Sequence, residues 1–317
     1  MKIGYCEKYK YLGAIFTRRN NMDEHITETK KKTEAAYNTA MAIAGSVDLK
    51  NIELQVMWEL LETCVLPIIT YGWEAETPRK KDTKQLKQIL DNIIKRIIMV
   101  PRSTPWEPLY METGLLDVGL KIEKNRMNYI DTMAKSENMI LRMIREDPDP
   151  SSWWNKHSKQ REEIRGRREQ SDNRHERREK REINNYVNGK MMEMIMEGTN
   201  KTKTKFYLDN LRNARPGRRA KYLDQCTRME ASIIFKARTR MLKVKGNYRN
   251  MFQNAQCRIC KAEEESQEHV LETCTEINRT TYGRTTTQDI FQEDPKSLKE
   301  TAEKIRKIMD LIECSSP

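Results

Sequence analysis

The sequence predicts a mainly α-helical protein, an elongated helical bundle built in modules with small cores. Only 37% of its 317 residues are hydrophobic and 33% are charged, which is apolar-poor for one compact globule of this length. Apolar residues recur at helical spacing along most of the chain, and the helix-interrupting residues glycine and proline number only 12 and 10. The exceptions are one strand-like segment near the N-terminus and one cysteine-rich segment near the C-terminus.

The N-terminal segment 9–16 (YKYLGAIF) predicts a short strand or hairpin arm, because it is rich in aromatic and β-branched residues. No partner strand is evident in the rest of the chain, so we expect the remnant of a larger sheet. A helix follows over 22–44 and ends at Gly45. The next helix begins at an N-cap, Asp48, and its predicted apolar face is Ile52, Val56, Leu60 and Cys64.

The clearest helix begins at Asp82 and stops at Pro101. Its pattern predicts a core-facing stripe: Leu86, Ile89, Leu90, Ile93, Ile94, Ile97 and Ile98. A short helix is predicted after Thr104, a cap followed by proline, with Gly114 at its end. One long helix then spans 117–145, and the sequence DPDP at 147–150 breaks the chain.

The second half of the chain is more highly charged. Residues 156–182 contain 11 bases and seven acids with almost no apolar side chain, which is typical of a solvated charged helix or a flexible linker. Two basic helical stretches follow, separated at Pro216, and the second covers 218–245. The last helix begins at Asp294, with a predicted buried stripe of Leu298, Ala302, Ile305, Ile308 and Ile312. We therefore expect five segments: 1–20, 21–147, 148–198, 199–250 and 251–317.

The positive charge is concentrated in one segment. The whole chain has a net charge of +12, and residues 199–250 alone carry 15 bases against three acids. Residues 261–317 carry eight bases against 13 acids. A basic block of this kind attracts a phosphate backbone. The candidate phosphate-binding residues are Arg215, Arg218, Arg219, Lys221, Arg238, Arg240, Lys243, Lys245 and Arg249.

Three cysteines and one histidine follow this block within 18 positions: Cys257, Cys260, His269 and Cys274. Zn²⁺ takes four tetrahedral ligands of this kind, and three thiolates with one imidazole are a common structural set. Because protein fills all four positions, the pattern predicts a structural ion without a reactive water. Ser266 is the predicted cap of a helix over 267–273. A straight α-helix would place His269 and Cys274 about 140° apart, so this helix must end before Cys274.

The remaining thiols and imidazoles give no pattern of a site. Cys6, Cys64, Cys226 and Cys314 show no pairing, and each is expected to be a small apolar residue or a free thiol. His25, His157 and His175 lie among charged residues, and we expect them at the surface. No signal of a secretory segment or a bilayer span appears, which predicts an intracellular protein of the nucleus or cytoplasm with no membrane partner.

Four phrases carry a resemblance to a known family: 9–13 (YKYLG), 65–73 (VLPIITYGW), 97–114 (IIMVPRSTPWEPLYMETG) and 236–249 (KARTRMLKVKGNYR) leading into the cysteine cluster. Together they resemble the C-terminal part of a non-LTR (LINE-type, jockey-like) retrotransposon reverse transcriptase, and the match in order covers nearly the whole chain. The resemblance implies the end of a palm strand, a thumb-like helical domain at 21–147, a basic segment and a CCHC zinc finger. It also implies RNA or DNA as the partner.

One departure from that family limits the activity that we expect. Polymerisation in the family needs two Mg²⁺ ions held by palm aspartates, two of them adjacent. This chain has 14 aspartates and no two are adjacent. A later Pro-Asp pair, part of the nuclease of some relatives, is also missing, since the sole pair is at 148–149. We therefore expect a nucleic-acid-binding chain without polymerase or endonuclease activity and without catalytic residues.

Two alternatives stay open. In the first alternative, the chain is a protein–protein interaction module with a structural zinc finger. Its assembly surfaces would be the stripe at 86–98 and the helix at 156–197. Otherwise it belongs to an active RNA-directed DNA polymerase whose palm-containing segment is encoded upstream or on another chain. The strand without a partner at 9–16 is the reason for the second alternative.

Overall fold

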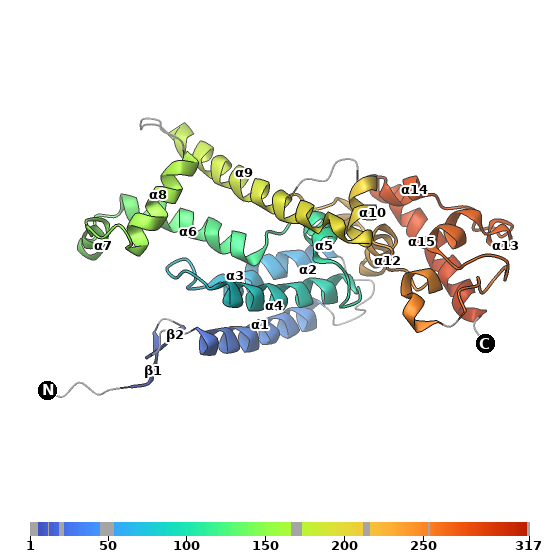
Figure 1. The fold of residues 1–317 in the computed structure, drawn as a ribbon, viewed down its shortest axis with the longest axis horizontal. Coiled ribbons are helices and arrows are strands. Elements are labelled where there is room, and N and C mark those ends of the chain that lie inside the picture. Colours follow the sequence, from blue (N-terminus) through green and yellow to red (C-terminus); the bar gives the residue numbers. More distant parts are fainter. Residues whose placement is uncertain are drawn as a thin grey trace. The chain divides into compact units, whose positions relative to one another are not determined.

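The structure is a computed structural model that describes residues 6–11, 13–18, 22–44, 54–165, 173–211, 216–252 and 254–315. These residues are mainly helical and include one two-stranded sheet, which confirms the predicted class (Figure 1). The chain divides into two compact units, each made of three segments. The first contains Met1–Ala36, Thr63–Leu90 and Leu116–Met194, and the second contains Tyr37–Glu62, Asp91–Leu115 and Ile195–Pro317. The predicted division into five consecutive segments stays a prediction.

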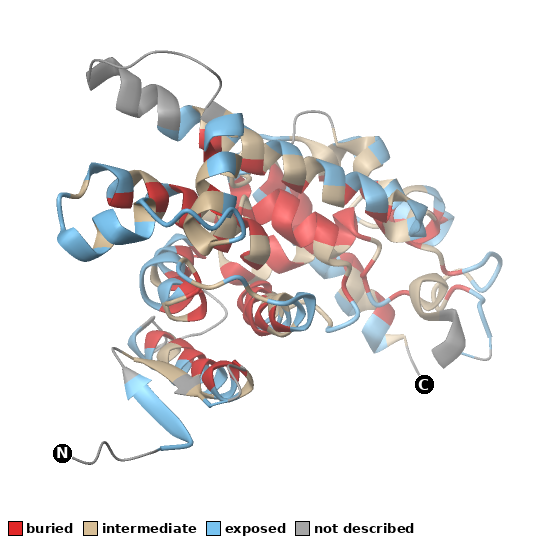
Figure 2. Cartoon of the chain, turned by 60° about the vertical axis from the view of Figure 1, so that its left-hand side comes forward, coloured by how far each residue is buried: buried red, intermediate tan, exposed pale blue. Residues whose placement is uncertain are grey.

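The N-terminal segment forms a hairpin with itself. Strand β1 (Lys8–Tyr11) pairs antiparallel with β2 (Ala14–Thr17), and Tyr9 lies opposite Phe16. Gly13 has a φ of +88°, a conformation that the turn needs and that other residues avoid. The partner strand that seemed to be missing from the sequence is therefore part of the same segment. Residues 6–10 are exposed (Figure 2).

The first unit combines this hairpin with helices. It contains α3 (Leu66–Thr70), α6 (Val118–Lys135), α7 (Met139–Arg145) and α8 (Trp153–Arg165). It also contains most of α9 (Asn173–Glu197) and the first parts of α1 (Asp23–Ala44) and α4 (Lys80–Ile98). Helix α6 packs against α3 and α8, and α7 packs against α8. A wide turn, η1 (Leu61–Val65), leads into α3.

Two histidines of the first unit are buried, so their predicted place at the surface is wrong. His25 is 4% exposed and lies 5.7 Å from the Trp73 ring, and His157 is 5% exposed and lies 5.2 Å from the Trp153 ring. The charged residues that directly precede them, Glu24 and Lys156, are exposed, so a charged neighbour in the sequence does not place a histidine at the surface. The side chain of His175 lies outside the described residues.

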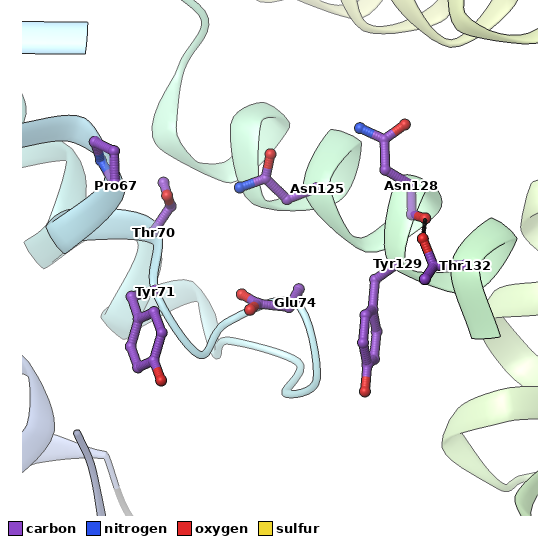
Figure 3. A pocket seen from close by; sticks show the side chains of 8 residues that line it. All are labelled: Pro67, Thr70, Tyr71, Glu74, Asn125, Asn128, Tyr129 and Thr132. Atoms are coloured by element: carbon purple, nitrogen blue, oxygen red, sulfur yellow. Dashed lines mark hydrogen bonds between the residues drawn. The ribbon is translucent and has the colours of Figure 1, made fainter. Parts of the chain in front are cut away.

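One cavity of about 390 Å³ lies in the first unit between the α3 end and α6 (Figure 3). Its lining includes Tyr71, Tyr129 and Asn125, and Glu74 is its one charged residue. No lysine or arginine lines it, so it offers no cation to a phosphate. None of the nine candidate phosphate-binding residues lines this cavity.

The second unit contains the cysteine cluster. Its elements are α2 (Leu54–Leu60), α5 (Trp106–Thr113), η2 (Gly198–Asn200), α10 (Thr202–Asn210), α11 (Tyr222–Gln225), α12 (Arg228–Arg238), η3 (Lys245–Met251), η4 (His269–Thr273), α13 (Thr275–Asn278), α14 (Thr287–Phe291) and α15 (Pro295–Cys314). Helix α12 packs against α15 and α14. The core between them includes Ala237, Val270, Ile290, Ile305 and Ile308, together with Cys257 and Cys274.

The two most strongly patterned helices are confirmed. All seven predicted core positions of α4 are buried, from Leu86 to Ile98. In α15, Asp294 caps the first turn by accepting the Ser297 N–H at 2.8 Å, and the predicted stripe is fully buried. Burial of the α4 stripe also removes it as a surface for assembly with another protein.

The predicted helix over 117–145 is wrong in its length. Asp117 caps its start as predicted and accepts the Gly119 N–H at 2.8 Å. The helix nevertheless ends at Lys135, because the Asn138 side chain accepts the Ile140 N–H at 2.9 Å and starts the separate helix α7. Asparagine competes with the helical backbone in this way and favours caps over helix interiors.

The predicted helix over 218–245 is also wrong in its length. It is divided into α11 and α12 by a capping box, in which the Thr227 side chain accepts the Glu230 N–H and the Glu230 carboxylate accepts the Thr227 N–H.

In the helix that precedes Pro67, the buried face is Leu54, Met57, Trp58, Leu61 and Val65, whereas Cys64 is exposed. The larger side chains Met57 and Trp58 decide which face turns inward. Asp48 and Ile52 lie outside the described residues.

Among the described residues, no helix combines the length and the apolar character that crossing a bilayer requires.

Candidate metal centre

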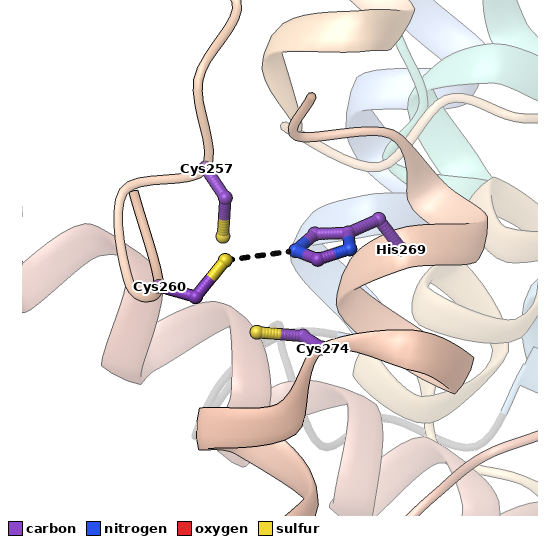
Figure 4. Close-up of side chains that lie close together, drawn as sticks. All are labelled: Cys257, Cys260, His269 and Cys274. Carbon is purple, nitrogen blue, oxygen red and sulfur yellow. Dashed lines mark hydrogen bonds between the residues drawn. The ribbon is translucent and has the colours of Figure 1, made fainter. Parts of the chain in front are cut away.

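The four predicted ligands converge. The donor atoms of Cys257, Cys260, His269 and Cys274 all lie within 4.8 Å of one another (Figure 4). Cys257 and Cys274 are fully buried, and His269 is 5% exposed. The Cys260 Sγ lies 3.2 Å from Nε2 of His269. Three sulfurs and one ring nitrogen therefore face a common point, and this cluster is able to hold a metal ion.

A tight turn places the first two cysteines. The Cys257 N–H donates to the Glu263 carbonyl at 2.7 Å, and the Lys261 N–H donates to the Cys257 carbonyl at 3.1 Å. Lys261 has a φ of +57°, so the chain reverses in the left-handed region just after Cys260. Gln256 and Glu264 form a bridge across the base of the turn. The short spacing between the cysteines thus brings two sulfurs to the same side.

The third and fourth ligands depend on a wide helical turn. Ser266 Oγ accepts the His269 N–H at 3.0 Å, so the predicted cap is confirmed. The Cys274 N–H donates to the His269 carbonyl at 2.7 Å, a bond across five residues instead of four. This wider turn brings Cys274 back toward His269, and the helix ends at Thr273 as the ligand geometry demanded. The angular conflict of a straight α-helix is thereby avoided.

Nδ1 of His269, the ring nitrogen that does not face the sulfurs, contacts two side chains. Nδ1 lies 3.0 Å from the Glu263 carboxylate and 3.3 Å from the Thr273 hydroxyl. With Nδ1 engaged there, Nε2 is the nitrogen that faces the sulfurs. A carboxylate behind a histidine ligand fixes the ring and its tautomer, which is a frequent arrangement around protein-bound metals.

The thiols differ in their electrostatic surroundings. Burial raises the pKa of Cys274 to about 11, and burial also raises the pKa of Cys257. Burial acts in the same direction on Cys260, but hydrogen bonds from the backbone of Ala262 and Glu263 and from His269 lower its pKa to about 6. Cys260 is therefore the thiol that is most readily available as a thiolate ligand.

A second carboxylate anchors the turn. Glu265 is fully buried, and its oxygens accept from the Arg258 guanidinium at 2.6 to 3.1 Å and from the backbone N–H of Arg258 at 2.9 Å. These donors outweigh the effect of burial and lower the pKa of Glu265. The sequence did not single out Glu265 or Arg258. The run of three glutamates at 263–265 reads as solvated surface, and nothing local distinguishes the last of them.

The predicted phosphate-binding residues have different surroundings. Arg218 and Lys221 are exposed, and the side chain of neither makes a hydrogen bond or an ion pair with a described residue. The Lys243 side chain is 81% exposed, with Glu313 at 3.5 Å, and the Lys245 ammonium donates to the Gln256 carbonyl at 2.8 Å. These four remain accessible to a ligand. Arg215 and the side chain of Arg249 lie outside the described residues.

The remaining predicted cations are engaged within the second unit. Arg238 is 4% exposed, and its guanidinium contacts the Glu112 carboxylate at 2.9 and 3.1 Å and the carbonyls of Ile290 and Gln292. Its assignment as a phosphate-binding residue is therefore wrong, since its charge is neutralised in a buried ion pair with Glu112. Arg219 is shared between Glu62 and Asp224, and Arg240 pairs with Glu268 while lying 4.0 Å over the Phe206 ring.

In comparisons with known proteins, no family model, no curated protein and no solved structure matches this chain.

Proposed function

We propose that this chain is the nucleic-acid-binding C-terminal portion of a retrotransposon reverse-transcriptase-like protein, stabilised by a structural Zn²⁺ ion. The observation that carries the proposal is the convergence of three thiols and one imidazole within 4.8 Å directly after the basic segment. A tetrahedral zinc with Zn–S bonds of about 2.3 Å needs sulfurs about 3.8 Å apart, which the cluster reaches with small side-chain shifts. No fifth donor is required, so the role of the ion is to stabilise the fold.

Accessible cations supply the nucleic-acid-binding part of the proposal. Arg218 and Lys221 precede α11. Lys243 and Lys245 precede the turn at 256–265 that carries Cys257 and Cys260, which we call the metal turn. Each offers a charge to a phosphate, and binding through phosphates releases counterions. If all four engage duplex phosphates, the logarithm of affinity falls with the logarithm of salt concentration with a slope of about −3.6.

The first test measures metal content and salt dependence on the purified chain. We expect one zinc per chain by mass spectrometry and a salt-dependent retention of labelled oligonucleotides on filters. Protein without stoichiometric metal that stays equally folded after chelation would contradict the structural zinc. Binding that is independent of salt, or absent below micromolar concentrations, would contradict the phosphate interface.

The second test reverses charges. Arg218→Glu with Lys221→Glu is expected to weaken binding and reduce the salt slope by about 2, since each lost phosphate contact lowers it by about 1. The matched control is Lys299→Glu with Lys304→Glu, two exposed lysines of α15 in the acidic C-terminal segment. Equal losses in both variants would indicate a general charge effect and no specific binding face.

The proposal predicts that this chain alone does not polymerise DNA. None of the 14 aspartates is adjacent to another, so the paired carboxylates of two-metal polymerisation are missing. A primer-extension assay with Mg²⁺ and the isolated chain is expected to give no product. Mg²⁺-dependent extension by the isolated chain would contradict this expectation and favour a polymerase.

A protein-interaction module is the second candidate, and α7 is the feature that favours it. Its side chains Met139, Ile140 and Met143 are 74%, 65% and 66% exposed. Charge substitutions at Met139 and Met143 should change self-association in sedimentation velocity if this surface assembles. They should leave oligonucleotide retention unchanged if the nucleic-acid interface is separate.

A further inference from the structure

The buried carboxylate of Glu265 lies between the metal ligands and the basic segment. In sequence it falls between Cys260 and His269, so a bound metal fixes the chain on both sides of it. Its carboxylate accepts the Lys245 backbone N–H at 3.0 Å while it also holds the Arg258 guanidinium. One fully buried side chain therefore contacts both the metal turn and the segment that carries the accessible lysines.

Backbone contacts reinforce the same connection. The Gly246 N–H donates to the Glu265 carbonyl at 2.9 Å, and the Arg258 guanidinium donates to the Lys243 carbonyl at 2.9 Å. A Cβ at Gly246 would lie 3.1 Å from the Glu265 carbonyl oxygen and 3.1 Å from Cα of Ser266, so only glycine permits this close approach without a shift. The segment 243–246 is thus attached to the metal turn at several points.

We propose that Glu265 is a positioning residue that couples metal occupancy to nucleic-acid binding by holding the segment 243–246 in place. This inference rests on the proposed function, since it concerns the metal and the phosphate contacts assigned there. With metal bound, the turn is closed and Glu265 holds the Lys245 backbone, so the ammonium groups of the exposed Lys243 and the half-buried Lys245 have a fixed location. Without metal, the turn loses this constraint. The conformational entropy lost when these lysines become ordered then opposes nucleic-acid binding.

Coupling of this kind is reciprocal. If metal raises oligonucleotide affinity by some factor, oligonucleotide raises metal affinity by the same factor, and typical factors are about 5 to 150. Both directions are measurable with the full chain. Oligonucleotide affinity is read from the anisotropy of a labelled 20-mer, with and without saturating Zn²⁺. Zinc affinity is read by competition with a chelating indicator, with and without saturating oligonucleotide. Agreement of the two factors shows that the measurement is at equilibrium.

The decisive variant is Glu265→Gln, which keeps the size of the side chain and removes its charge. We expect its coupling factor to fall below about 2, against at least about 5 in the wild-type chain. The visible spectrum of the Co²⁺-loaded variant should keep the strong bands of a tetrahedral thiolate site, which shows that the ligands are still assembled. The control is Glu264→Gln, the exposed neighbour in the same turn, which should keep the wild-type factor.

A second variant separates positioning from loss of folding. Gly246→Ala changes no charge and no metal contact, but its methyl group pushes the backbone away from Glu265. It should load metal normally and still lose the coupling. If Glu265→Gln fails to load metal, the result for Gly246→Ala decides the question.

Two results would overturn the proposal. One is a wild-type chain that binds both metal and oligonucleotide with a coupling factor near 1. The other is a Glu265→Gln or Gly246→Ala chain that loads metal and keeps the wild-type factor. Failure of the proposed function looks different, because the wild-type chain would then bind no stoichiometric metal or no oligonucleotide at all.

Discussion

Single residues of the metal centre have roles that their neighbours in the sequence do not share. Glu263, Glu264 and Glu265 are consecutive, yet the first contacts His269, the second is exposed and the third is fully buried against Arg258. The four ligands were predictable because metal chemistry dictates both their types and their spacing. The surrounding carboxylates were not, because their partners are set by the turn geometry and leave no pattern in the sequence.

Glu263 is expected to strengthen metal binding through His269. Its carboxylate lies 3.0 Å from Nδ1, and partners of this kind typically contribute about 10- to 100-fold in metal affinity. Because the Glu263 side chain is 66% exposed, we expect Glu263→Gln to weaken zinc binding by about 10-fold, at the lower end of that range. Competition with a chelating indicator measures this, and Glu264→Gln is the control. An affinity equal to that of the control would show that the contact does not orient His269.

Arg238 is expected to stabilise the fold and not to bind a ligand. Its partner Glu112 is 126 residues away, which explains why the sequence pattern alone placed Arg238 in the phosphate-binding set. Removing one partner of a buried pair leaves an uncompensated charge, so Arg238→Ala should lower the free energy of unfolding by about 3 to 5 kcal/mol. Urea unfolding measures this. Lys243→Ala, at a mostly exposed site, should stay within about 0.5 kcal/mol of the wild type. Similar effects of the two substitutions would contradict the assigned roles.

At the scale of elements, the sequence predicted those helices whose signals are local. Helix α15 has its cap at Asp294 and a complete apolar stripe, and α4 has seven apolar positions in register. The errors occurred where a polar side chain starts a new helix inside a long helical pattern, as Asn138 and Thr227 do. Capping residues are also tolerated in helix interiors, so their spacing alone does not say which role they take.

The capping box at Thr227 is expected to set the start of α12. The Thr227 side chain accepts the Glu230 N–H, and an N-cap of this kind contributes about 1 kcal/mol, with a range of roughly 0.5 to 2. Thr227→Ala should therefore lower the free energy of unfolding by about 1 kcal/mol, whereas Thr227→Ser keeps the hydroxyl and should cost much less. Urea titrations of both variants provide the comparison. Equal costs would show that the methyl packing of Thr227 matters and its hydroxyl does not.

At the scale of the whole molecule, net charge overstates the surface that is available to a polyanion. Residues 199–250 contain 15 bases, but four of them form ion pairs with acids of the chain. Arg238 pairs with Glu112, Arg240 with Glu268, and Lys201 with Glu107. Arg219 pairs with both Glu62 and Asp224. These acids come from several parts of the chain, so the charge count of the segment could not show the pairing. A phosphate ligand therefore meets fewer cations than the sequence implies, and its salt dependence should be correspondingly shallow.

Acid is expected to destabilise the chain through its two buried histidines. Burial, the largest cause in each case, lowers the pKa of His25 and of His157 below the ordinary value of 6.5. Near and below pH 6.5 the unfolded chain binds these protons before the folded chain does. Stability is therefore fully present above about pH 7 and falls as the pH drops through 6.5 toward the lowered values.

The measurement is the free energy of unfolding in urea at pH 7.5 and at pH 5.5. The matched variant carries His25→Leu and His157→Gln, in which glutamine can keep a hydrogen bond to the Thr77 hydroxyl that lies 3.1 Å from His157 Nε2. Acid also protonates zinc ligands, but this contribution is the same in both chains and cancels in the comparison. We expect the wild-type chain to lose more stability than the variant over this interval. An equal loss in both chains would show that the two imidazoles take up their protons as readily in the folded state as in the unfolded state.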